Sequence, residues 1–284
     1  MENPGPAPKL VASDVDGTLI TSQERILPRV RDVIVRAVQS GTEVALATGR
    51  PHRWIFPVLD QLPIRPVCVT SNGAVVYDSA HDRILASHPL SPEAMAVVLE
   101  RAQEAFHHVG GVEVGCERIG RSAFDPEDEL FVVSPGFVNT WEEQGFGVLP
   151  VHEVIGEPAA KMILRHPELS APEMFNLLAP VVDTEVAHVT FSMNEGLLEI
   201  AAPGVTKALG VSTLADLHGI GQRDVIAFGD MPNDIEMLAW AGTGVAMGNA
   251  RDSVKDVADM TTGTNDEAGL AQVLERWFQE PMAH

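Results

Sequence analysis

Two aspartates, Asp14 and Asp16, stand at the end of a short apolar segment, residues 10–12, and directly before Gly17. Side chains two residues apart on a strand point to the same side, so both carboxylates are expected to project together. Adjacent carboxylates repel one another unless a cation or a shared proton lies between them, and Mg²⁺ binds oxygen ligands of this type. Asp-Gly pairs also occur in simple turns, so this pair alone indicates either a metal-dependent site or a turn.

A second acidic pair follows another apolar segment, residues 225–228. Asp230 stands in the same setting as Asp14, and Asp234 falls in the first turn of the next predicted helix, where a carboxylate is often only an electrostatic cap. Ligands of open parallel sheets bind at the carboxyl ends of the strands. Carboxylates converging there require a metal ion or a cationic partner, and Lys207 is an available cation.

Thr48, Gly49 and Arg50 end a third apolar segment, residues 42–47. A hydroxyl group followed by backbone N–H groups at the start of a helix is suited to binding an anion. Each of these features is weak by itself. In this order on one sheet, they together indicate a phosphate site beside a metal site.

The elements that must position these residues alternate between strands and helices, which is typical of βαβ units and a parallel sheet. The pattern predicts strands at residues 10–12, 42–47, 67–70, 224–228 and 244–247. It predicts helices at residues 27–40, 54–61, 207–217, 232–241, 252–258 and 267–278. We therefore expect an α/β fold with a doubly wound parallel sheet.

The pattern changes in the middle of the chain. Ser91 and Pro92 are typical of a helix start and predict a helix to about residue 107. A strand at 161–164, a helix at 172–178 and a hairpin of 189–192 with 197–200 follow, whereas no elements are predicted for 110–158. We expect an inserted α+β domain at 83–189 and a core formed by 1–82 and 190–284.

Composition excludes several classes of partner. With 19 Lys and Arg against 40 Asp and Glu, the net charge is −21, which argues against nucleic acid and anionic membrane surfaces. No apolar run approaches the ~18 residues of a membrane span, and residues 1–8 do not resemble a signal peptide. The two cysteines, Cys68 and Cys116, do not suggest a disulfide framework. We expect a cytoplasmic protein.

Four segments resemble, in order, the four motifs of the haloacid dehalogenase-like (HAD) superfamily: Asp14-Val15-Asp16-Gly17-Thr18-Leu19, Ala47-Thr48-Gly49-Arg50, Gly204-Val205-Thr206-Lys207 and Gly229-Asp230-Met231-Pro232-Asn233-Asp234. Three further segments resemble its Cof-type subgroup, subfamily IIB: Ser71-Asn72-Gly73-Ala74, Met247-Gly248-Asn249-Ala250 and Asn265-Asp266-Glu267. The resemblance implies a Rossmann-like HAD core. It also implies that the insertion is a cap that determines substrate specificity.

The resemblance implies a role for each matched residue. Asp14 is the expected nucleophile, and Asp16 the expected general acid and base. Thr48 and Lys207 are expected to act in catalysis by binding the phosphoryl oxygens and neutralising their charge. The phosphate-binding set also includes Gly49, Arg50 and Asn233. Mg²⁺ is the implied cofactor, and its expected ligands are Asp14, the backbone carbonyl of Asp16, Asp230 and, through water, Asp234.

This reading predicts a Mg²⁺-dependent phosphatase that hydrolyses small phosphorylated metabolites, such as sugar phosphates, through an aspartyl-phosphate. A sugar phosphomutase is an alternative, because that related group shares the first motif. It would need extra cationic residues in the insertion, where few are present. A phospho-accepting or inactive binding module is a further alternative, but it gives Asp16 and the insertion no purpose. The sequence indicates neither the particular substrate nor the oligomeric state.

Overall fold

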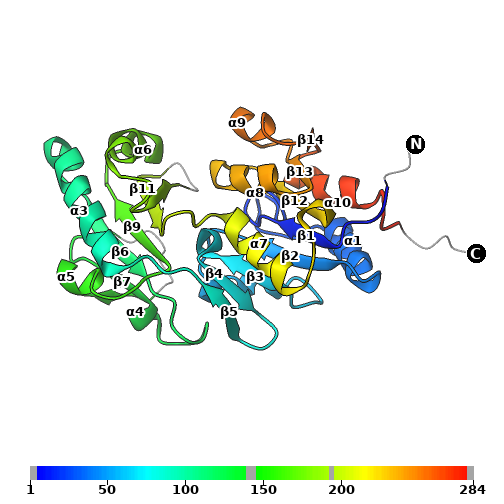
Figure 1. Ribbon diagram of the computed structural model, residues 1–284, viewed down its shortest axis with the longest axis horizontal. Helices are drawn as coiled ribbons and strands as arrows, with labels where there is room; N and C mark the ends of the chain where they lie inside the picture. The colour runs from blue at the N-terminus through cyan, green and yellow to red at the C-terminus, as the bar shows by residue number, and fades with distance from the viewer. Residues whose placement is uncertain (1–4, 139–144, 192–194, 280–284) are drawn as a thin grey trace, which may run out of the picture. The chain divides into compact units, whose positions relative to one another are not determined.

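The computed structural model describes residues 5–138, 145–191 and 195–279. The chain forms two compact units (Figure 1). The first unit combines Met1–Asp82 with Lys207–His284, and the second is the continuous segment Arg83–Thr206. The first unit is therefore built from both ends of the chain.

A mostly parallel sheet forms the centre of the first unit. The strands that the first unit contributes lie in the order β14-β13-β12-β1-β2-β3-β4, and neighbours are parallel except for the antiparallel pair β3–β4. The strands are β1 (Leu10–Ser13), β2 (Glu43–Ala47), β3 (Val67–Thr70), β4 (Val75–Asp78), β12 (Val225–Gly229), β13 (Thr243–Ala246) and β14 (Met260–Thr261). Every residue of β1 and β12 is buried, as expected for central strands covered on both faces.

Helices cover both faces of this sheet (Figure 1), so the expected doubly wound α/β architecture is confirmed. α1 packs against α10, and α7 packs against α8. The helices are α1 (Pro28–Gln39), α2 (Phe56–Leu59), α7 (Lys207–Leu217), α8 (Ile235–Trp240), α9 (Asp252–Lys255) and α10 (Gly269–Leu274). Short 3₁₀ turns are η1 (His52–Trp54), η2 (Ser71–Gly73), η5 (Gln222–Asp224), η6 (Pro232–Asp234) and η7 (Asn265–Glu267).

The second unit contains a separate sheet in the order β10-β11-β9-β6-β7-β8, antiparallel except for β7–β8. The strands of this sheet are β6 (Glu113–Glu117), β7 (Phe131–Val133), β8 (Gly147–Val148), β9 (Lys161–Arg165), β10 (His188–Thr190) and β11 (Leu197–Ala201). The unit also contains β5 (Arg83–Ser87), at the start of the segment, which is not part of this sheet. Its helices and 3₁₀ turns are α3 (Pro92–Phe106), η3 (His107–Val109), α4 (Glu127–Leu130), α5 (Val151–Val154), α6 (Ala171–Leu178) and η4 (Ala179–Val181). It is thus an α+β unit.

Alternating side chains give the second sheet two different faces. Met162 and Leu164 of β9 join the core formed with α3 and α6. Ile163, between them, belongs to a smaller cluster with Phe131 and Val133. Lys161 forms a buried ion pair with Glu199, so this second face also carries charge.

The second boundary between the units lies later than the sequence analysis expected. The sequence pattern predicts a return to the core at residue 190, whereas in the structure the first unit resumes at Lys207. The reason is that β11 pairs with β9, and β10 pairs with β11, inside the sheet of the second unit. The predicted hairpin therefore belongs to the insertion; residue 192 of its first strand lies outside the described residues.

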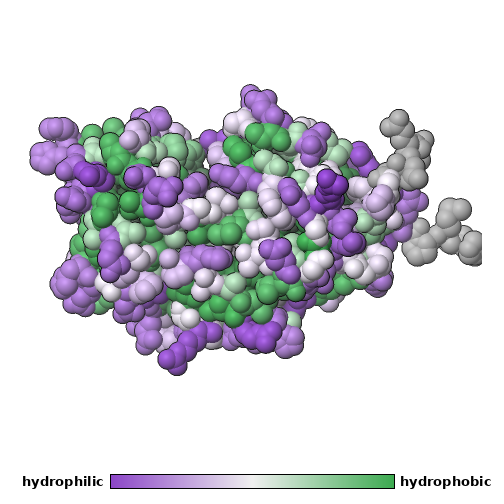
Figure 2. Space-filling model, in the orientation of Figure 1, coloured by the Kyte–Doolittle hydropathy of each residue, from purple (hydrophilic) through white to green (hydrophobic). Residues whose placement is uncertain are grey.

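The described helices include none that is long and apolar enough to cross a membrane. Hydrophilic residues are spread over the visible surface of both units (Figure 2), in keeping with the strongly acidic composition.

Candidate active site

The two acidic segments lie at the same edge of the parallel sheet. Asp14 directly follows β1, and Asp230 directly follows β12. These strands are parallel neighbours with Ser13 opposite Phe228. The backbone N–H of Asp14 continues the pairing by donating to the carbonyl of Phe228 at 2.9 Å. The strand pairing therefore brings together carboxylates more than 200 residues apart in the chain.

Lys207 connects two of the acidic residues. Its Nζ donates to Asp14 Oδ1 at 2.6 Å and to Asp234 Oδ1 at 2.7 Å. Its side chain is only 1% exposed. Burial alone lowers the pKa of a lysine, but the charges of Asp14 and Asp234 outweigh this effect and raise the pKa of Lys207. Lys207 is therefore a fixed cation at the first residue of α7.

Both carboxylate oxygens of Asp234 bind neighbouring groups of the site. It is fully buried, and Oδ1 binds Lys207. Its Oδ2 accepts hydrogen bonds from the backbone N–H groups of Asp230 and Met231, both at 3.0 Å. Asp234 thus fixes the segment that carries Asp230 and provides a second counter-ion for Lys207.

The acidic cluster carries more negative charge than one lysine balances. Ligand oxygens of Asp14, Asp230 and Asp234 can lie within 4.8 Å of one another. Burial, followed by neighbouring carboxylates, raises the pKa of Asp14 well above its usual value, although Lys207 opposes the change. Burial and the charge of Asp234 likewise raise the pKa of Asp230, to about 6. A cation between these oxygens would relieve the cost, so the donor set fits a hard divalent metal ion.

The turn after β1 supports this cluster. Thr18 Oγ1 donates to Asp230 Oδ1 at 2.9 Å, and Asn249 Nδ2 donates to the carbonyl of Gly17 at 2.8 Å. Gly17 adopts a φ of +82°, and a Cβ atom there would lie 2.4 Å from Asp230 Oδ2. The glycine is therefore required both by the left-handed backbone and by the close approach of Asp230.

Asp16 lies in a different environment from Asp14. Its side chain is 53% exposed and forms a two-point ion pair with Arg50. Arg50 Nε donates to Asp16 Oδ2 at 2.9 Å, and Nη2 donates to Oδ1 at 2.5 Å. The two aspartates that the sequence predicts together thus differ in environment: Asp14 is buried against a lysine, and Asp16 remains accessible beside an arginine.

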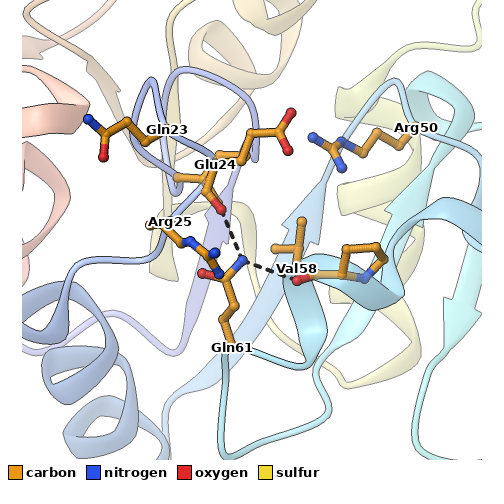
Figure 3. Close-up of a pocket in the computed structure, with 8 residues that line it drawn as sticks. Gln23, Glu24, Arg25, Arg50, Val58 and Gln61 are labelled. Carbon is orange, nitrogen blue, oxygen red and sulfur yellow. Dashed lines mark hydrogen bonds between the residues drawn. The ribbon is translucent and has the colours of Figure 1, made fainter. Parts of the chain in front are cut away.

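Arg50 also lines a pocket of about 190 Å³ in the first unit. In this pocket its guanidinium group and the carboxylate of Glu24 point toward one another (Figure 3). Gln61 Nε2 donates to the carbonyl of Glu24 at 3.0 Å and to that of Pro57 at 3.1 Å, which ties the turn containing Glu24 to α2. Arg50 therefore has carboxylates on more than one side.

Thr48, Gly49 and Asn233 occupy neighbouring loops. Thr48 directly follows β2, which pairs with β1; it is buried, and its Oγ1 accepts from the backbone N–H of Arg50 at 3.1 Å. Asn233 lies in η6, and its Nδ2 donates to Asn72 Oδ1 at 2.9 Å. In these contacts Thr48 binds Arg50 and Asn233 binds Asn72. Of the predicted phosphate-binding residues, Lys207 is the one whose described contacts include the predicted nucleophile, Asp14.

Three supporting residues carry no assigned role in the sequence analysis. They are Thr18, Asn72 and Asn249, which contact Asp230, Asn233 and the turn at Gly17, respectively. All three lie inside the segments that resemble superfamily or subgroup motifs. Position within a motif was therefore the available signal, but the bonding partners depend on the tertiary fold.

Comparison with known proteins defines the class. The family profile described as haloacid dehalogenase-like hydrolase matches residues 11–274. The chain belongs to this family. This confirms the predicted resemblance to the haloacid dehalogenase-like superfamily and the predicted hydrolase class.

Several proteins named as phosphatases are similar to this chain along almost their full length. The 5-amino-6-(5-phospho-D-ribitylamino)uracil phosphatase YitU of Bacillus subtilis is 31% identical over 274 residues, covering 95% of this chain and 98% of the relative. The pyridoxal phosphate phosphatase YbhA of Escherichia coli is 27% identical, covering 94% and 97%.

Solved structures share the architecture. A haloacid dehalogenase-like hydrolase from Bacteroides thetaiotaomicron superposes with a TM-score of 0.73 at 27% identity and covers 95% of this chain and 100% of its own. The HAD subclass IIB sugar phosphatase BT4131 has a TM-score of 0.77 at 23% identity, covering 95% and 98%. This second likeness shows the fold.

Proposed function

We propose that the protein is a Mg²⁺-dependent phosphatase of small phosphorylated metabolites that works through an aspartyl-phosphate on Asp14. The observation that carries the proposal is the buried contact of Lys207 with Asp14 and Asp234 beside Asp230. This arrangement combines a carboxylate nucleophile, a fixed cation and a metal-compatible oxygen cluster. Phosphoryl transfer depends mainly on such positioning and charge neutralisation.

Asp14, Asp230 and the backbone carbonyl of Asp16 are the residues that would hold Mg²⁺. Both oxygens of Asp234 already accept hydrogen bonds, so Asp234 would contribute through a bound water. When bound, the ion supplies positive charge that offsets the phosphoryl oxygens and the surrounding carboxylates. It would also favour the ionised form of Asp14, which is the form able to attack phosphorus.

In the first step, an oxygen of Asp14 bonds to phosphorus while the bond to the ester oxygen breaks. Protonated Asp16 gives its proton to the departing oxygen, so the leaving group departs as an alcohol. Lys207 and Thr48 neutralise and orient the phosphoryl oxygens. Arg50 can exchange its contact with Asp16 for a phosphoryl oxygen, which frees the exposed Asp16 carboxyl to face the leaving group.

In the second step, water attacks the phosphorus of the aspartyl-phosphate. Asp16, now ionised, takes one proton from that water, and the bond between phosphorus and Asp14 breaks. Inorganic phosphate leaves, Asp14 is again a carboxylate, and Asp16 is again protonated. One residue thus serves as acid and then base, which requires the accessible position that Asp16 occupies and buried Asp14 lacks.

We further propose that residues 83–206 form the cap that selects the leaving group. The support is their position, which begins after the second motif and ends within the third, and the charged pair Lys161–Glu199 on the sheet face opposite the helical core. We place the protein in the cytoplasm, because Cys68 and Cys116 are free, buried thiols and a framework of disulfides is absent from the described residues.

The test is a phosphate-release screen over phosphorylated metabolites in the presence of Mg²⁺. Sugar phosphates belong in the panel, as do pyridoxal phosphate and the ribitylaminouracil phosphate named for two relatives. Multiple turnovers on at least one metabolite, lost in Asp14→Asn, would support the proposal. Accumulation of an isomerised product without phosphate release would instead favour a mutase. A single phosphorylation of the protein without turnover would favour the phospho-accepting module.

A further inference from the structure

The turn that follows β3 has an uncommon backbone. Ser71, Asn72 and Gly73 have φ values of +49°, +56° and +100°, so two non-glycine residues in succession are left-handed. A side chain in this region costs energy, least for asparagine and aspartate. Backbone strain of this kind persists where the surroundings enforce it, and it is common at functional sites.

This turn binds the loop that carries Thr48 and Arg50. The backbone N–H of Ser71 donates to the carbonyl of Arg50 at 2.9 Å, and that of Asn72 donates to the carbonyl of Thr48 at 3.0 Å. The left-handed conformation aims these two successive N–H groups at the same loop. The strain therefore accompanies direct support of the predicted phosphate-binding residues.

The side chain of Asn72 reaches a second part of the candidate site. Its Oδ1 accepts from Asn233 Nδ2 at 2.9 Å in a buried contact. Asn233 immediately precedes Asp234, which binds Lys207 and the backbone of Asp230. One residue thus joins the Thr48 loop, through its N–H, to the acidic segment, through its carboxamide.

The helix that begins with Lys207 also packs against this turn. Gly210 of α7 comes so close that a Cβ atom there would lie 2.3 Å from Val69 Cγ1 and 3.0 Å from the Cα of Gly73. The turn therefore lies against α7, less than one helical turn from its catalytic lysine. The loop that carries Thr48, the segment that carries Asp234 and the helix that carries Lys207 thus all contact this turn or the strand residue before it.

We propose that Asn72 is a positioning residue that fixes the separation between Thr48 and the segment 230–234. This inference rests on the proposed function of the same site. The five-coordinate transition state must contact the nucleophile, Lys207 and Thr48 together, whereas a bound phosphate tolerates looser geometry. Loss of the Asn72 carboxamide should therefore weaken binding of the transition-state geometry more than binding of the ground state.

The experiment measures binding of two anions to the Mg²⁺-loaded full-length protein by calorimetry. Orthovanadate, which readily becomes five-coordinate, represents the transition state, and inorganic phosphate represents the ground state. Asn72→Gly removes the carboxamide without straining the backbone. We expect it to weaken orthovanadate binding about 10- to 100-fold, the scale for a misplaced group, with a clearly smaller change for phosphate.

Matched variants separate positioning from general loosening. Asn72→Asp keeps an acceptor for Asn233 Nδ2 and tolerates the same φ, but it adds negative charge beside the acidic cluster, so it should weaken binding of both anions. Asn72→Ala should also lower Tm, because alanine is strained at this φ. Ala268→Gly relaxes a left-handed residue outside the site (φ +59°) and should change neither affinity.

Each result bears on a different claim. Unchanged orthovanadate affinity in Asn72→Gly, or equal weakening of both anions in that variant, would overturn the positioning role. A wild-type protein that binds neither anion would overturn the proposed function itself and this inference with it. Loss of orthovanadate binding in Asn72→Gly that clearly exceeds the loss of phosphate binding would support both.

Discussion

Replacing Lys207 by methionine tests the electrostatic argument most directly. Methionine has a similar length and an apolar end, so the main change is loss of the charge that contacts Asp14 at 2.6 Å and Asp234 at 2.7 Å. Both ion pairs are buried, and removing one partner of such a pair typically costs about 3–5 kcal/mol. For a unit of this size, that corresponds to a fall in Tm of about 6–20 °C. Turnover should be lost as well.

The pH dependence provides the internal check. Without Lys207, the stranded carboxylates can avoid their buried charge by taking up protons, which is easier at low pH. The folded variant therefore binds more protons than its unfolded chain, and the stability difference from wild type should shrink between pH 7.5 and pH 5. Adding Asp234→Asn to Lys207→Met should recover part of the loss, because it removes one orphaned charge.

Calorimetry and circular dichroism at both pH values measure these differences. Lys255→Met is the control: its Nζ also donates a hydrogen bond, at 2.8 Å to the carbonyl of Gly248, but it forms no ion pair among the described contacts. That variant should lose little stability. A drop of less than about 1 kcal/mol for Lys207→Met, the range of surface ion pairs, would refute the reasoning, as would a deficit that grows toward low pH.

Three further predictions concern the chemistry. Asp16→Asn should lose about 10²–10⁴-fold activity on sugar phosphates, yet it should accumulate a hydroxylamine-sensitive phosphoryl adduct from p-nitrophenyl phosphate. Mass spectrometry should map this adduct to Asp14, and a label on another residue would contradict the mechanism. Activity should require Mg²⁺ and fall with excess Ca²⁺, which prefers more ligands and longer distances; equal turnover with both ions would count against the site. Mg²⁺ affinity should rise as pH increases through about 6, because Asp230 must lose its proton; a titration with flat affinity from pH 5 to 7.5 would show that Asp230 is not a ligand.

The sheet was predictable because its strands carry strong local signals. β1 is a run of apolar residues ending in polar ones, and α1 places Val30, Val33, Ile34 and Ala37 on one buried face. The ends of weaker elements depended on the fold. The last helix was predicted from residue 267 but begins at Gly269, because Ala268 is left-handed (φ +59°). The predicted helix at 54–61 is reduced to α2 and a short 3₁₀ turn.

The middle of the chain was harder to predict. β6, β7 and β8 are short, and β6 also pairs with β9, which follows only after β7 and β8. Their formation therefore depends on partners that local patterns do not reveal. The same holds within the site. Motif order predicted Asp14, Lys207, Asp230 and Asp234 as neighbours, and the ion pairs agree. The bridge from Asn72 to Asn233 joins loops 161 residues apart and left no signal in spacing.

The division of the first unit between both chain ends also constrains how the protein is made. Asp14 and Lys207 are separated by 193 residues, and β1 acquires its neighbour β12 only after the insertion has been synthesised. At about 5–20 residues per second on the ribosome, the early strands β1–β3 wait roughly 10–40 s with one edge of β1 unpaired. The continuous segment 83–206 can close its own sheet during that interval. An exposed apolar strand edge invites association with other chains, so slowed synthesis of the insertion should lower the soluble yield before it alters the finished site.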